Sequence, residues 1–143
     1  MSREAIAANL VTTLKGVIGT YAPKLVTREP FDFEKLSNAQ FPAILVQTDT
    51  ESRADLTIGG SSQTRDATID YSLVCYIKGS SIDTARNGIA SAIENAVDAD
   101  RTRGGYALDS QIVSIQTDQG SIAPVGGVII TVRVRYNFTR GAA

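Results

Sequence analysis

Apolar residues occupy every second position along two segments of the chain, residues 68–78 and 128–138. This period of two predicts strands that turn one face to a core and the other to solvent or a partner. In residues 2–21, and in a stretch that ends near Asp98, apolar residues instead recur every three or four positions. That spacing is typical of amphipathic helices. The pattern therefore predicts two long strands and two helices.

Helix boundaries and three further strands complete the predicted secondary structure. Pro23 is expected to end the first helix, because proline cannot continue one. Ser80, followed by Asp83, resembles a capping box for the second helix. The remaining strands are expected at residues 25–28, 43–48 and 111–118, the last with Val113 and Ile115 facing inward.

The resulting order, α–β–β–β–α–β–β, defines an α+β fold. Two helices with one apolar stripe each can cover one face of a mostly antiparallel sheet, which gives a two-layer sandwich. Residues 1–143 are expected to form a single domain, and Gly88 is expected to let the second helix lie close on the sheet. The shared core is expected to contain Leu10, Leu14, Leu73, Ile77, Ile89, Ile93, Ile130 and Val132.

A polar segment, residues 49–66, is expected to project from the domain as a hairpin arm. Gly59-Gly60 lies near its middle and suits a tight turn. The strand leading into this turn would be much longer than the usual five or so residues. A flexible loop is the alternative.

The tight turn fixes which residues of the arm face each other. With the two glycines as the turn residues, Arg53 falls opposite Asp66. Leu56 and Ile58 are the sizeable apolar residues near the tip, so we expect another subunit to cover them. We also expect the arm to be mobile in the free subunit, because an isolated two-stranded ribbon is marginally stable.

Composition and charge narrow the class of protein. The chain has 143 residues, of which 43% are hydrophobic and 20% charged, and its net charge is −1. These values are ordinary for a soluble globular domain. The sequence shows no basic cluster that would favour nucleic acid or an acidic membrane. No signal peptide is expected, and no apolar run is long enough to span a bilayer.

Candidate catalytic and metal-binding chemistry is sparse. The chain has no histidine, and its one cysteine, Cys75, is expected to be buried on a strand. The paired glycines are expected to form turns, and the acidic residues of 49–55 and 98–103 to form solvated ion pairs with neighbouring arginines. We therefore predict a protein that is not an enzyme and that uses no cofactor and no metal.

Arg133 and Arg135 share the polar face of the last strand, and Arg140 follows. Arginines in this arrangement can contact phosphates or carboxylates. Three arginines are a weak signal for nucleic acid, so a solvated sheet face or a contact with another subunit is the preferred interpretation.

Several segments together resemble one known family. They are an N-terminal amphipathic helix, a proline followed directly by a strand (QFPAILV, residues 40–46), a polar arm, a long strand (ATIDYSLVCYI, 67–77), a helix beginning SIDTARN (81–87) and a final strand (ITVRVRY, 130–136). In this order, which covers nearly the whole chain, they resemble the tail terminator (tail completion) proteins of long-tailed bacteriophages.

The resemblance implies a structural virion protein. It would form a ring, usually of six subunits, that caps the tail tube and joins the tail to the head or neck. The implied partners are other copies of the chain, the tail tube protein and a neck or connector protein, with DNA only passing through the ring lumen and no membrane. The protein would be assembled in the host cytoplasm and located in the virion. The candidate contact residues are Arg53, Leu56, Ile58, Asp66, Arg133 and Arg135.

Other classes remain open at this point. A head–tail connector or another neck protein shares this size and composition and is the main alternative. A double-stranded-RNA module also has the order α–β–β–β–α, but it needs a basic cluster where this chain has residues 81–84, Ser-Ile-Asp-Thr. A small enzyme would need a general base that the sequence does not offer.

Overall fold

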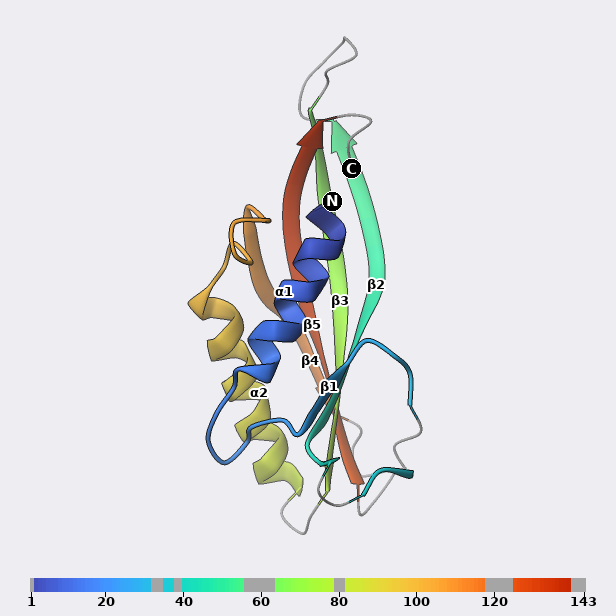
Figure 1. Ribbon diagram of the computed structural model, residues 1–143, viewed down its shortest axis with the longest axis vertical. Coiled ribbons are helices and arrows are strands. Elements are labelled where there is room, and N and C mark those ends of the chain that lie inside the picture. The colour runs from blue at the N-terminus through green and yellow to red at the C-terminus, as the bar shows by residue number, and fades with distance from the viewer. Residues whose placement is uncertain are drawn as a thin grey trace.

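The computed structural model describes residues 2–31, 35–37, 40–55, 64–78, 82–117 and 125–139. Seven elements follow the predicted order and form one five-stranded sheet with two helices (Figure 1). The strand order is β1-β2-β3-β5-β4, with β1 parallel to β2 and every other pair antiparallel. The elements are α1 (Ser2–Lys15), β1 (Leu25–Thr27), β2 (Ala43–Asp55), β3 (Thr64–Lys78), α2 (Ile82–Ala99), β4 (Asp109–Thr117) and β5 (Val125–Thr139).

Both helices lie on the same face of the sheet, which confirms the predicted α+β sandwich (Figure 1). The core forms between this face and the helices, and all eight residues predicted for it are buried there. Cys75 is also fully buried, as expected. Its removal from water raises the pKa of the thiol to about 12, so it behaves as a small apolar side chain.

Helix α1 is shorter than predicted, because it ends at Lys15 rather than near Tyr21. The Gly16 amide donates to the carbonyls of Thr12 and Thr13, which closes the last turn. Gly19 then takes a positive φ of 104°, a conformation that a helix cannot contain. The apolar spacing continued past Lys15, but the glycines turn the chain away from the helix axis.

Tyr21 leaves this turn and packs against helix α2 at Gly88. A Cβ atom at Gly88 would lie 2.2 Å from the Tyr21 ring. The small residue at position 88 therefore makes room for an aromatic ring.

The prediction that Val113 faces the core is also wrong, whereas Ile115 lies on the core face of the sheet but is not buried. The pairing of β4 with β5 shifts register between Ile112 and Ser114, so Val113 is the extra residue of a β-bulge. Ile112 packs against the core, whereas Val113 and Ile115 are 38% and 45% exposed. Ile115 pairs with the buried Ile130, but β4 is the last strand of the sheet and leaves its side chain half uncovered.

Leu73 is fully buried on the central strand, so shortening its side chain should destabilise the folded protein strongly. Leu73→Ala should lower the free energy of unfolding by about 2–5 kcal/mol, because the removed atoms leave a cavity that the neighbours fill only partly. Urea denaturation would measure this, with the exposed Val113→Ala as the control. A loss below about 0.5 kcal/mol, the size of a surface effect, would contradict the assigned core face.

The Gly88–Tyr21 contact predicts a change of sign in a double-mutant cycle. In the wild-type background, Gly88→Ala should destabilise the protein by about 1–3 kcal/mol, because the new methyl group overlaps the ring. In a Tyr21→Ala background the same change should stabilise the helix by up to about 1 kcal/mol, since alanine favours helix more than glycine does. Thermal or urea unfolding of the four proteins gives the result, and equal effects in both backgrounds would refute the contact.

Candidate assembly surfaces

The helix-free face of the sheet carries the two arginines singled out from the sequence. Arg133 lies directly opposite Asp70 and donates two hydrogen bonds to its carboxylate, at 2.9 and 3.1 Å. Arg135 reaches diagonally to Asp66, with Nε 3.1 Å from each carboxylate oxygen. Both arginine side chains remain about half exposed. Each charge is thus matched within the chain, and the face is polar rather than basic.

Hydroxyl groups surround one of these ion pairs. Thr50, Ser52 and Thr68 line a shallow hollow of about 420 Å³ together with Asp70 and Arg133. Such a surface offers hydrogen-bond donors and acceptors that water or a partner protein can satisfy. It is suited to contact rather than to proton transfer, because its carboxylate is already held by an arginine.

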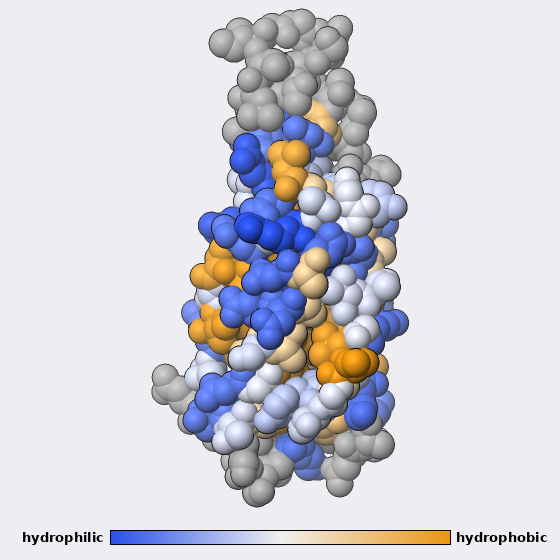
Figure 2. Space-filling model, turned by 90° about the vertical axis from the view of Figure 1, so that its left-hand side faces the viewer, coloured by the Kyte–Doolittle hydropathy of each residue, from blue (hydrophilic) through white to orange (hydrophobic). Residues whose placement is uncertain are grey.

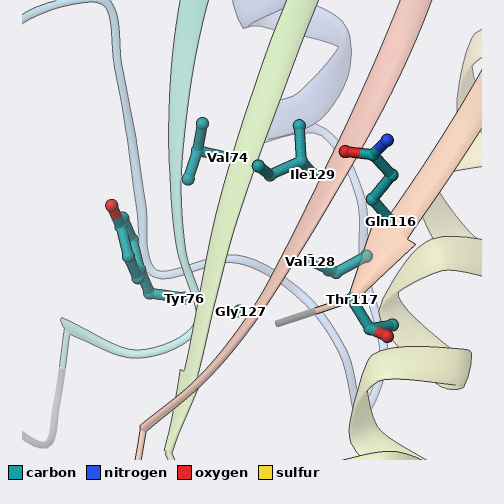
Figure 3. A pocket seen from close by; sticks show the side chains of 7 residues that line it. All are labelled: Val74, Tyr76, Gln116, Thr117, Gly127, Val128 and Ile129. Atoms are coloured by element: carbon teal, nitrogen blue, oxygen red, sulfur yellow. The ribbon is translucent and has the colours of Figure 1, made fainter. Parts of the chain in front are cut away.

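The opposite end of the same face is apolar. Val74, Tyr76 and Ile129 line a second hollow of about 230 Å³, with Gln116 and Thr117 at its side (Figure 3). Phe31 packs edge-on against Tyr76, at 5.7 Å between ring centroids. The helix-free face therefore changes along its length from an apolar end to a charged, hydroxyl-rich end.

The base of the predicted arm differs from the expected hairpin in its register. Between Ala43 and Thr48, β2 pairs with β3 in the register that a two-residue turn at 59–60 requires. A β-bulge at Asp49 then shifts the pairing by one residue. Arg53 consequently lies opposite Ala67, and the predicted pairing of Arg53 with Asp66 is wrong.

The bulge also moves Arg53 to the other face of the sheet. There Arg53 donates to Glu51 at 2.7 Å and its guanidinium lies 5.3 Å from the centre of the Phe138 ring. Arg3, from the first turn of α1, donates to the second oxygen of Glu51 at 2.8 Å. One carboxylate thus joins the start of α1 to the outer part of β2.

Burial by itself would raise the pKa of Glu51, but the hydrogen bonds and charges of Arg53 and Arg3 outweigh burial and lower it. The ionised form is therefore favoured in the folded protein. This contribution to stability is present above the pKa of the unfolded chain, and it is lost as the pH falls through the folded-state value.

The described part of the arm is three-stranded rather than two-stranded. Residues from Thr64 onward in β3 pair with β2 on one side and with β5, as far as Thr139, on the other. All three strands continue past the start of α1 (Figure 1). The expectation of an isolated ribbon is thus wrong for these residues. Leu56, Ile58 and the Gly59-Gly60 turn lie outside the described residues, as do Ser80 and Arg140.

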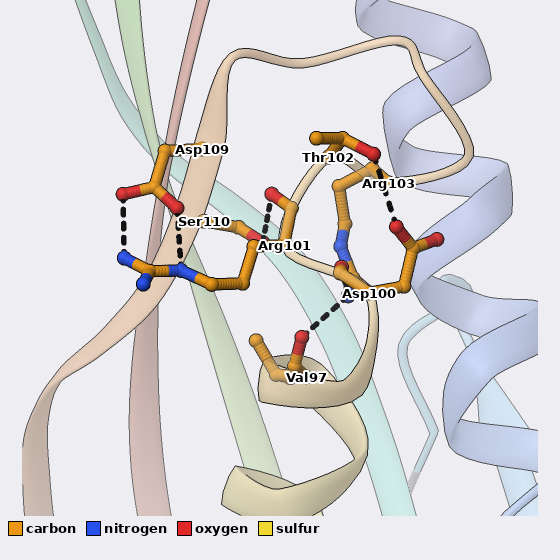
Figure 4. Close-up of polar contacts among 7 residues, drawn as sticks. All are labelled: Val97, Asp100, Arg101, Thr102, Arg103, Asp109 and Ser110. Atoms are coloured by element: carbon orange, nitrogen blue, oxygen red, sulfur yellow. Dashed lines mark hydrogen bonds and ion pairs between the residues drawn. The ribbon is translucent and has the colours of Figure 1, made fainter.

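The loop after α2 contains a buried arginine that the sequence did not indicate. Arg101 forms a solvated ion pair with Asp109, at 2.7 and 2.8 Å, rather than with the acidic residues of 98–103 that were expected to be its partners (Figure 4). Arg103, in contrast, is fully buried. It donates to the carbonyl of Val97 in the last turn of α2, to that of Asp100 just after the helix, and to Thr13 of α1. Burial lowers the pKa of its guanidinium.

Arg103 therefore acts as a structural cap that ties the end of α2 to α1. A positive φ of 50° at Arg103, followed by two glycines with positive φ, turns the chain so that its side chain points back under the loop. The sequence signal for this turn was the Gly104-Gly105 pair, which was expected to be a turn but not to bury its neighbour.

No three histidine, cysteine, aspartate or glutamate side chains gather among the described residues in a way that could hold a metal ion. No helix in the described part of the chain is both long and apolar enough to cross a membrane.

Comparison with known proteins supports the fold. No protein-family model and no curated protein sequence matches the chain. A chain in a solved structure described as the virion of a native gene transfer agent (GTA) particle has the same fold, with a TM-score of 0.58. The match covers 95% of this chain and 97% of that chain, at 16% sequence identity. The two chains thus share their architecture from end to end.

The Glu51 cluster predicts a pH-dependent loss of stability. Glu51→Gln should lower the free energy of unfolding at pH 7 by about 1–2 kcal/mol, because Arg3 and Arg53 lose a charged acceptor. The difference from wild type should begin to shrink as the pH falls below about 4, the ordinary pKa of a glutamate, and should disappear below the lowered pKa of the folded protein. Urea unfolding at several pH values measures both effects. Glu4→Gln, at the more exposed pair with Arg28, is the matched control and should change the free energy of unfolding much less, because water screens that pair.

Proposed function

We propose that this chain is a structural protein of a virus-like particle, and specifically a tail terminator that forms a ring on the end of the tail tube. The observation that carries the proposal is the end-to-end match of fold with a chain of a gene transfer agent virion, at 95% and 97% coverage. The order of elements that resembled tail terminators in the sequence is the order found in the structure.

The surfaces of the molecule suit a subunit of an assembly. One face of the sheet has no helices, and its charges are already paired with each other, so another protein can cover it without leaving an ion unmatched. A closed ring needs two different patches, each meeting the other patch on the next copy. The two ends and two edges of this sheet differ from one another and can supply them.

In this role the protein has no catalytic activity and needs no cofactor. Its partners are other copies of itself, six in the proposed ring, together with the tail tube protein and a neck or connector protein. DNA would pass through the lumen without being read. The protein would assemble in the host cytoplasm and remain in the tail or neck of the virion.

A head–tail connector or another neck protein of the same particle is the second candidate. The match of fold supports membership of a virion, and it supports this alternative as well, because size and architecture do not separate the two roles. Binding to the tail tube does separate them, since a terminator contacts the tube directly.

The proposal predicts a closed oligomer of defined size. Native mass spectrometry of the full-length protein over a range of concentrations should give one dominant species, six times the subunit mass, and electron microscopy should show rings. A monomer at every concentration, with and without tail tubes, would contradict it. Added during polymerisation of the cognate tube protein, a terminator should bind tube ends and stop elongation, whereas a connector should leave tube length unchanged.

A further inference from the structure

Exposed apolar side chains gather at one edge of the sheet. Of the six large apolar residues that are strongly exposed in the described part of the chain, four lie between Tyr106 and Ile115, in β4 and the segment that leads into it. A fifth, Ile129, lies on the neighbouring strand opposite Gln116. We call these five residues the edge patch: Tyr106, Leu108, Val113, Ile115 and Ile129. Figure 2, a view of the side with α2 and β4, shows apolar surface in orange between polar regions.

The backbone of β4 is open along the same edge. β4 is the last strand of the sheet, so among the described residues its outer side pairs with nothing. Residues 110–117 contain no charged residue and no proline. Charges and prolines are the usual means by which soluble proteins prevent an edge strand from pairing with another chain. Their absence, together with exposed apolar side chains, marks this edge as one that is covered in the working state of the protein.

The opposite edge of the sheet is open over a comparable length. β1 pairs only with Ala43–Leu45 of β2, which leaves residues 46–55 without a neighbouring strand on that side among the described residues. This open stretch of β2 differs in chemistry from β4, because it carries Asp49, Glu51, Arg53 and Asp55. The sheet therefore has two open edges, one uncharged and one charged.

The strand directions make the two edges compatible. Three successive antiparallel pairings, β2 with β3, β3 with β5 and β5 with β4, mean that β4 runs opposite to β2. If a second copy is placed beside the first with its helices on the same side, its β2 meets β4 as an antiparallel neighbour. β4 and the open stretch of β2 also lie at the same height in the sheet. Asp109 pairs with Arg135, Arg135 with Thr68, and Thr68 with Ser52, so Asp109 is level with Ser52.

We propose that β4 of one copy pairs with the open stretch of β2 in the next copy, so that the sheet continues from subunit to subunit. The inference rests on the proposed self-assembly and specifies its interface. Pairing β4 with β4 of another copy would stop at a dimer, because such a contact is two-fold symmetric. Pairing β2 with β2 would bring two predominantly acidic stretches together. Only the β4–β2 contact joins unlike edges, avoids like charges and leaves both edges of every subunit used in a closed ring.

The test places two charges on the edge. In Val113→Lys/Ile115→Lys both substituted side chains are exposed, so circular dichroism and urea unfolding should match wild type. The concentration at which the oligomer half-dissociates, measured by mass photometry, should rise roughly tenfold or more. Ile18→Lys is the matched control, because Ile18 is the exposed apolar residue that lies away from the edge. It should assemble as wild type does.

Hydrogen exchange of the wild-type protein identifies the partner strand. On assembly, the amides of both residues 109–117 and residues 46–55 should exchange more slowly. Protection of 109–117 alone would overturn the proposal in favour of β4–β4 pairing or another occupant. An oligomer with neither segment protected would overturn the interface while leaving the proposed ring intact. A protein that stays monomeric would overturn both.

Discussion

The structure depends on one strand being hydrogen-bonded on both sides for almost its whole length. β3 pairs with β5 from Thr64 to Lys78 and with β2 over nearly the same span. Every second residue of β3 is thereby fixed toward the helices, and the intervening residues are fixed toward the helix-free face. This strand positions three features: the core under α1 and α2, the Asp70–Arg133 pair and the outer part of the arm.

The strength of alternation along β3 and β5 explains why the fold could be predicted from the sequence. A residue such as Leu73 or Ile130 lies in a run long enough that a one-residue error would bury charges, so the inward face is unambiguous. The spacing of apolar residues likewise identified both helices. The end of α1 was missed because Val17 and Tyr21 continue the helical spacing, although Gly19 between them takes a positive φ.

The surface residues were harder to place because their positions depend on single extra residues. The bulges at Asp49 and Val113 reverse which residues face the helices, and nothing in the local sequence marks either of them. Arg53 was therefore assigned to the wrong partner, and Val113 to the core. Arg103 was missed for a different reason: its burial follows from a positive φ and from carbonyls that only the folded end of α2 presents.

The bulge at Asp49 also determines where β2 can lose a residue. Because the pairing on either side of the bulge differs by one residue, deleting Asp49 would restore a single uninterrupted register along β2. Glu51 would still lie opposite Ile69 and Arg53 opposite Ala67, so Arg3 would keep its carboxylate and Phe138 would keep the guanidinium above it. Loss of one residue at Asp49 would thus leave both faces of the outer arm as they are, whereas loss of a paired residue further along β2 would exchange them.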